Sequence, residues 1–188
     1  LGSFDAGMSI ESVTIDALGD GAVTFDDIDS AMGGVLIINR LASMRDDDSY
    51  TMSQDHMIMG ANTGLVTPKG VDVSSAHGLV FVAEFNSDTP AVQVFSSCAS
   101  GDVAPLLSLV ASNDARPWDV DYDAATDRAF VALTNGTVAV FDEVTRKLMA
   151  GMTTITGEDR LITPAMSGAA VTAPTNIHGI DYDPQSDS

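Results

Sequence analysis

Cysteine, basic side chains and long apolar runs are all scarce in this chain of 188 residues. Cys98 is the only cysteine, so no disulfide can form within the chain, which fits both a cytosolic and an exported protein. The chain carries 8 Lys and Arg against 27 Asp and Glu, a formal net charge of −19. This charge argues against nucleic acid or anionic lipid as a partner, because both require clustered Lys and Arg. No apolar run reaches the roughly 18 residues of a transmembrane helix.

What the chain does contain is enough apolar material for a core. Hydrophobic residues make up 45% of the sequence, so residues 1–188 are expected to form a single domain or part of one. The acidic excess favours solubility, cation binding, or saline or extracytoplasmic surroundings. We therefore expect an exported protein, periplasmic or at the cell surface.

Residues 116–148 have the clearest pattern in the chain. Large apolar side chains alternate with acidic ones over 118–122, two mostly apolar runs follow at 128–133 and 137–142, and clusters of Asp, Asn, Gly and Thr separate these runs. Such alternation predicts three consecutive antiparallel strands. Asn135-Gly136 predicts a type I′ hairpin turn, which requires positive φ at both central residues.

The same pattern recurs along the chain. A second copy occupies 68–95, a third opens at 176–184, and a fainter one opens at 25–29. Repeats of about 40 to 60 residues with three or four short strands predict an all-β fold, a β-propeller of four-stranded antiparallel blades. About four blades are expected, as units near 25–64, 65–113, 114–163 and 174–188, with 1–24 supplying the outer strands of a preceding blade.

Two local predictions lie outside the strong copies. The run 35–38 is apolar throughout and predicts a strand that is buried on both faces. Residues 143–149 contain the best helical pattern, but we expect a turn into an outer strand there instead.

Residues 117–148 resemble the YVTN-type repeat of bacterial and archaeal β-propellers. The resemblance rests on an opening proline, an acidic turn, an aromatic-aliphatic strand, an Asn-Gly hairpin and a Val-x-Val strand that ends in Asp. These are Pro117, 123–127, 130–132, Asn135-Gly136 and 138–142. The copy at 68–95 is less similar, because 86–89 replace the tight hairpin. The resemblance implies a propeller, and such propellers include lactonase-like enzymes, surface proteins and binding scaffolds.

The number of copies bears on closure of the ring. We expect a fragment of a larger propeller of about six to eight blades, whose exposed edge is covered by the rest of the propeller or by another subunit. A compact four-bladed ring, in which the first strands complete the last blade, is the alternative. The expected function is a non-enzymatic scaffold or binding module, a subunit of a larger assembly with a protein partner. The alternative is a lactonase-like hydrolase with a metal-assisted site at the propeller channel.

Three carboxylates form the first candidate site. Asp119, Asp121 and Asp123 alternate with Val120 and Tyr122, so they share one face of the predicted strand. Three adjacent carboxylates repel one another unless they are solvated or bridged by a hard cation such as Ca²⁺. The Gly and Glu that an EF-hand loop requires are missing. A solvated acidic face, or Asp side chains that cap the backbone at a turn, is the competing interpretation.

Soft ligands form the second candidate site. Met52, His56, Met57 and Met59 combine thioethers with an imidazole, which suits copper(I). Met57 and Met59 also share a strand face, so packing in a core explains them equally well.

The third candidate site is the mouth of the predicted channel. If the first strand of each blade lines this channel, Lys69, Asp119 and His178 lie near its mouth. A hydrolase needs a metal or a converging His and Glu set there, and the chain has only 3 histidines. No catalytic residue is predicted. Cys98 lies in a loop of small residues, as a surface thiol, an attachment point or a buried side chain.

Overall fold

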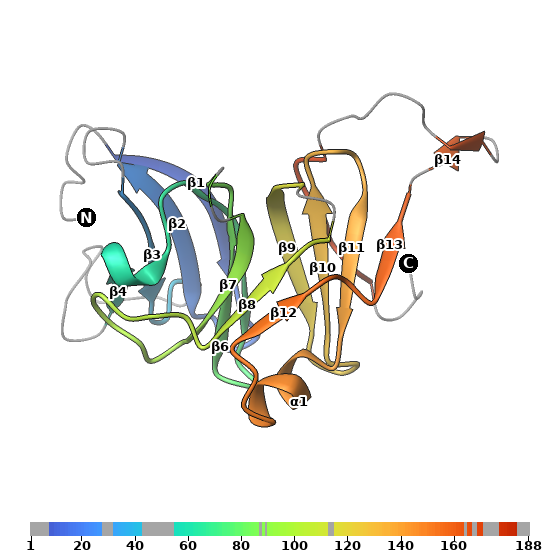
Figure 1. The fold of residues 1–188 in the computed structure, drawn as a ribbon. Helices are drawn as coiled ribbons and strands as arrows, with labels where there is room; N and C mark the ends of the chain where they lie inside the picture. Colours follow the sequence, from blue (N-terminus) through green and yellow to red (C-terminus); the bar gives the residue numbers. More distant parts are fainter. Residues whose placement is uncertain are drawn as a thin grey trace.

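The computed structural model describes residues 8–27, 32–42, 55–86, 88, 90–112, 115–163, 165–166, 169–170 and 177–183. These residues form an all-β fold in which three sheets follow one another along the chain (Figure 1). The first sheet contains β1 (Met8–Ile15), β2 (Gly21–Asp27), β3 (Met32–Ile38) and β4 (His56–Met59), in that order. A short 3-10 helix, η1 (Ala61–Thr63), follows it.

The second and third sheets repeat this antiparallel order. The second contains β5 (Pro68–Ser74), β6 (Leu79–Glu84), β7 (Ala91–Ser96) and β8 (Leu107–Val110). The third contains β9 (Pro117–Asp123), β10 (Arg128–Leu133), β11 (Val138–Asp142) and β13 (Arg160–Ile162). A separate pair, β14 (Ala165–Met166) and β15 (Ala169–Ala170), comes last.

The outer edge of each of the first two sheets is paired with a segment that comes later in the chain. After helix α1 (Val144–Met149), strand β12 (Thr154–Thr156) runs parallel to β8 at the edge of the second sheet, and the chain then returns to the third sheet as β13. On the first sheet, Ile58 of β4 forms a parallel bridge with Gly101. These pairings cover edges that would otherwise expose unpaired backbone groups.

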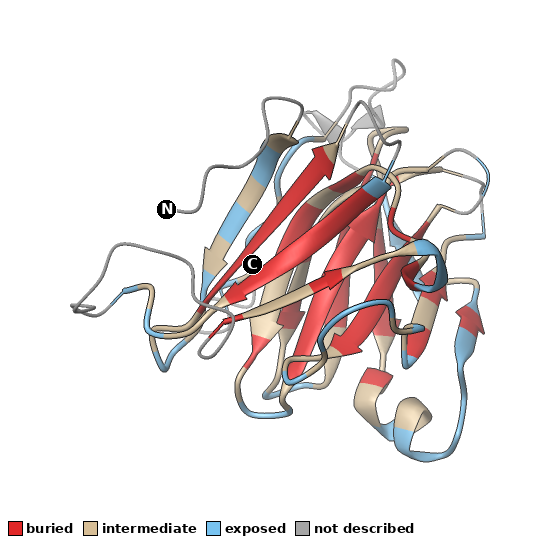
Figure 2. Ribbon diagram, turned by 90° about the vertical axis from the view of Figure 1, so that its left-hand side faces the viewer, coloured by how far each residue is buried: buried red, intermediate tan, exposed pale blue. Residues whose placement is uncertain are grey.

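The core lies between the sheets. Strand β5 packs against β1 and β2 of the first sheet, and β9 packs in the same way against β5 and β6 of the second. In β6 the side chains alternate between two clusters, with Val80 and Val82 toward the first sheet and Phe81 and Ala83 toward the third. A strand in this position is buried on both faces, which is why its residues 79–83 are all apolar (Figure 2).

The structure confirms the predicted strand at 35–38, which is buried at 35–37 and half-buried at Ile38. The described residues contain no helix long and apolar enough to span a membrane. The structure differs from the predicted repeat boundaries. Strands β1 and β2 pair from Ile15↔Gly21 to Met8↔Asp27, and β2 pairs with β3 on its other side. Residues 8–24 therefore belong to the same sheet as 25–27, and a unit that starts at 25 divides this sheet. The segment at 25–27 resembles the opening of the other copies in composition, but it is the second strand of its sheet.

Two local predictions were wrong in detail. The hairpin at Asn135-Gly136 forms, but only Gly136 has a positive φ (83°), so the turn is not type I′. The Asn135 side chain accepts hydrogen bonds from the N–H and the hydroxyl of Thr137 instead. Residues 144–149 form helix α1 and not a turn into an outer strand, because the Asp127 carboxylate accepts the N–H groups of Thr145 and Arg146 at the start of the helix.

Candidate functional site

The sheets are joined by the same pair of contacts twice. Asp72 of β5 accepts a hydrogen bond from the N–H of Tyr122 in β9 (2.8 Å), and the Tyr122 ring stacks on Phe81 with centroids 4.4 Å apart. On the third sheet, Asp121 accepts the N–H of Tyr182, and the Tyr182 ring stacks on Phe130 at 4.5 Å. Residues 177–183 thus lie against the third sheet as β9 lies against the second.

The other two predicted calcium ligands also bind backbone groups. Asp119 accepts hydrogen bonds from the N–H groups of Ile180 and Val120, each at 3.0 Å. Asp123 accepts the N–H of Ala125 and the hydroxyl of Thr126 in the turn after β9. Among the described residues, no group of three His, Cys, Asp or Glu side chains is placed to hold a metal ion. Calcium at Asp119, Asp121 and Asp123 stays a prediction.

These carboxylates are unusual acids. Burial raises the pKa of Asp72 from 3.8 to about 6, although the N–H groups of Tyr122 and Val73 oppose this rise. Burial also raises the pKa of Asp119 and Asp121. Burial therefore makes the ionised form of these side chains less favourable than in water, while the backbone N–H donors favour it.

A pH dependence follows from the Asp72 shift. The folded chain binds a proton at Asp72 more tightly than the unfolded chain does. Protonation of Asp72 therefore stabilises the fold fully below about pH 3.8, and this stabilisation is lost as the pH rises through about 6. Asp72→Asn keeps an acceptor for Tyr122 and is expected to flatten the profile by up to about 3 kcal/mol. Urea denaturation between about pH 4 and pH 8 measures this. The prediction fails if the free energy of unfolding of the variant depends on pH as steeply as that of the parent.

Two of the residues predicted at the channel mouth, Lys69 and His178, both lie against the Trp118 ring. Lys69, Trp118 and His178 each stand three positions before the Asp of their strand, and they form a column. The Lys69 ammonium lies 5.9 Å from the Trp118 ring centroid, and the His178 ring stacks on Trp118 at 4.4 Å. Asp119 follows Trp118 and binds the Ile180 N–H beside His178. The equal spacing was visible in the sequence, although Trp118 was not predicted as part of this site.

Lys69 is also held by two acids of the first sheet. Its Nζ lies 2.9 Å from Glu11 Oε1 and 3.3 Å from Asp26 Oδ2. Glu11 forms a β-bulge in β1, because the pairing register with β2 shifts between Ile10 and Ser12. The remaining oxygen of Asp26, Oδ1, is buried without a hydrogen-bond partner. The column therefore has a compensated cation at one end and the exposed His178 ring at the other.

The predicted copper ligands do not all fall in one place. Met57 and Met59 pack against a cluster formed by Val23, Phe25 and Leu36. His56 points to the opposite face of β4 and lines a separate cavity of about 180 Å³. Cys98, an exposed free thiol, lines the same cavity. Met52 lies outside the described residues. Copper binding stays a prediction, and core packing is the observed role of the two methionines.

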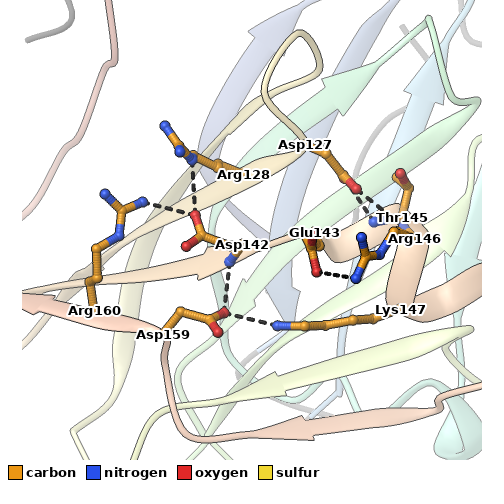
Figure 3. A network of polar contacts seen from close by, with 9 residues as sticks. All are labelled: Asp127, Arg128, Asp142, Glu143, Thr145, Arg146, Lys147, Asp159 and Arg160. Carbon is orange, nitrogen blue, oxygen red and sulfur yellow. Dashed lines mark hydrogen bonds and ion pairs between the residues drawn. The ribbon is translucent and has the colours of Figure 1, made fainter.

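A polar network that the sequence analysis did not identify anchors the outer parts of the third sheet (Figure 3). Asp142 binds Arg128 Nε at 2.9 Å and Arg160 at 2.8 Å, which links β10 and β11 to β13. Asp159 binds Lys147 at 2.9 Å and accepts the Asp142 N–H. The network fixes α1 and β13 on the sheet. No spacing rule signals it, because its members come from four separate elements.

Comparisons with known proteins give little more. No protein-family model matches the chain, and no curated protein matches it. One solved structure with a similar fold is described as the crystal structure of a nidogen/laminin complex. The TM-score is 0.48 at 17% sequence identity, over 71% of this chain and 44% of that chain. The match thus spans less than half of that chain.

Proposed function

We propose that this chain is part of a YVTN-type β-propeller and acts as a non-enzymatic protein-binding module of an exported assembly. The propeller proposal is supported by the succession of the three sheets and by the repeated Asp and Tyr contacts between them. Each described sheet is then one blade, and residues 177–183 begin a fourth. A closed four-bladed ring and a larger ring are both compatible with these contacts.

The observation that carries the binding proposal is an exposed apolar face on β1. Ile10, Val13 and Ile15 are 60%, 59% and 51% exposed. The cross-strand partners of Ile10 and Val13 are Phe25 and Val23, which are two positions apart in β2, so Ile10 and Val13 lie on one face of the sheet. The bulge at Glu11 allows this because it adds one residue between them. Clustered exposed apolar side chains mark interaction surfaces more often than they mark a free surface. The partner is a protein, or the remainder of the propeller.

Native mass measurement of the protein isolated from its own cells tests this proposal. The chain has a mass of 19.5 kDa, and a stable assembly with a partner is expected to be heavier. Val13→Asp places a charge in the middle of the β1 face and is expected to release the partner. Ile162→Asp is the matched control, because Ile162 is 49% exposed on β13, at the far edge of the third sheet. An unchanged assembly mass in Val13→Asp contradicts the proposal.

A second candidate function rests on the column of Lys69, Trp118 and His178. A lactonase-like hydrolase with a metal-assisted site at the channel mouth would use the exposed His178 imidazole as a ligand or base, with Asp119 beside it. Hydrolysis of simple lactones in the presence of added Ca²⁺ or Zn²⁺ tests this. His178→Gln is expected to remove such activity without unfolding the chain, since the side chain is exposed. Activity that survives this substitution argues against the site.

A further inference from the structure

A cavity of about 460 Å³ lies on the second sheet, away from the channel-mouth column and the β1 face. Its wall includes Gln93 of β7, Ser108 and Val110 of β8, and Thr154 of β12. Ala111 and Ala115, in the segment that leads to β9, line it as well. Strand β12 reaches the second sheet only after the chain has built most of the third, so the cavity lies at the junction of two units (Figure 1). Its volume is in the range of small-molecule sites, about 300–1,000 Å³.

Gln93 is the buried polar group of this cavity, since only 6% of it is exposed. Its Oε1 accepts a hydrogen bond from the Ser108 hydroxyl at 2.6 Å. Its Nε2 donates to no described residue, although a carboxamide has two N–H donors. This Nε2 group is not one of the buried atoms that lack a partner, so it stays accessible, and a polar ligand in the cavity can accept its hydrogen bonds.

The chemistry of the wall selects the partner. The described residues that line the cavity include no Lys, Arg or His, and Asp88 lies among them, so anions are disfavoured. Val110, Ala111 and Ala115 offer small apolar contacts. A ligand amide supplies both an acceptor for the Gln93 N–H groups and a donor for its Oε1. Such a ligand therefore pairs with the glutamine in either orientation of the carboxamide.

We propose that this cavity is a binding site for a small uncharged molecule that carries an amide group, held by the Gln93 carboxamide with Ser108 and Thr154 beside it. The site is independent of the protein-binding function, because it uses neither β1 nor the column at Lys69. It also depends on the parallel pairing of β12 with β8, since Thr154 enters the wall only through that pairing.

Nuclear magnetic resonance of the ¹⁵N-labelled full chain with N-methylacetamide tests the site. The side-chain NH₂ signals of Gln93 are expected to shift and saturate, while those of Gln54 and Gln185 act as internal references. Acetate, which is similar in size but charged, is expected to leave Gln93 unchanged. Shifts that rise without saturation at all three glutamines, or equal shifts with acetate, would overturn the proposal.

Two substitutions locate the binding in the cavity. Ala111→Leu fills the space and is expected to weaken the apparent affinity by about tenfold or more, which corresponds to about 1.4 kcal/mol. Ala150→Leu, at the exposed end of α1, is its matched control and should leave the titration unchanged. Thr154→Leu, at an exposed position of β12, gives a second obstruction if Ala111→Leu does not fold. Saturating shifts that persist in a folded obstructed variant would place the amide elsewhere and contradict the assignment.

Discussion

Tyr122→Ala is expected to lower the free energy of unfolding by about 3–5 kcal/mol, the range for removal of a large buried aromatic side chain. Tyr122 is 6% exposed and stacks on Phe81 between the second and third sheets. Its hydroxyl donates to Asp127 at 2.7 Å, and Asp127 in turn binds the first N–H groups of α1. The substitution therefore opens a cavity between two sheets and leaves Asp127 with one donor fewer. Urea denaturation measures the loss.

Tyr122→Phe separates the two effects. It keeps the stack on Phe81 and removes only the hydroxyl, so the expected loss is about 1–2 kcal/mol. Tyr182→Ala removes the equivalent ring from Phe130, but Tyr182 is only half-buried, so its loss is expected to be smaller than that of Tyr122→Ala. If Tyr122→Ala is no more destabilised than Tyr122→Phe, the ring does not join the sheets as described.

Gly70→Ala is expected to destabilise the chain by several kcal/mol. A Cβ at Gly70 would lie 2.5 Å from the Cα of Asp119 and closer still to Asp119 Oδ1. The backbone of β9 cannot move away without loosening its packing on β5, and overpacking of this kind typically costs about 1–3 kcal/mol or more. The close approach is also what holds Asp119 beside the column of Lys69, Trp118 and His178. Thermal or urea unfolding, together with the chemical shift of the Ile180 N–H that binds Asp119, reports both consequences.

Gly179→Ala is the matched control for this prediction. Gly179 occupies the position equivalent to Gly70, but a Cβ there would approach Asp119 Oδ2 no closer than 3.8 Å, an ordinary contact. The substitution is expected to change the free energy of unfolding by less than about 0.5 kcal/mol. Equal effects of the two substitutions would contradict the described approach of β5 to β9.

Much of the fold was predictable because the strands of the second and third sheets carry strong local signals. Alternation at 118–122, the apolar run at 79–83 and the turn at Asn135-Gly136 each predict their element without reference to distant residues. The first sheet was placed wrongly because its signal is split. β1 contains a bulge at Glu11 that interrupts the alternation, and the Asp residues at 26 and 27 imitate the opening of the other copies. Pairing between strands decides the boundary, and the sequence does not report it directly.

The sequence predicted which candidate residues share a strand or a repeat position better than it predicted the contacts that they make. The sequence grouped Asp119, Asp121 and Asp123 correctly on one strand, but it offered no sign that Ile180 and Tyr182 would donate backbone hydrogen bonds to the first two. Such contacts join residues that are far apart in the chain. Lys69 and His178 were predicted from their place in the repeat, while Trp118 between them was read only as a strand residue. The Gln93 cavity depends on the return of β12 to the second sheet, for which no sequence signal exists.

The acidic character of the chain is partly explained by these contacts. Asp72, Asp119 and Asp121 act as acceptors for backbone N–H groups between successive sheets, and Asp127 and Asp123 serve turns and the start of α1. Carboxylates suit this role because a charged acceptor makes a stronger hydrogen bond than a neutral one. A metal ion is not required to account for their spacing.

Hydrogen exchange at the amides of Tyr122 and Tyr182 tests the central claim, that residues 177–183 lie on the third sheet as β9 lies on the second. Both N–H groups donate to an Asp of the preceding inner strand, so both are expected to exchange slowly. Asp121→Ala should accelerate exchange at Tyr182 and leave Tyr122 protected, while Asp72→Ala should do the reverse. Exchange at Tyr182 that matches an unstructured chain, or that does not respond to Asp121→Ala, would contradict the claim.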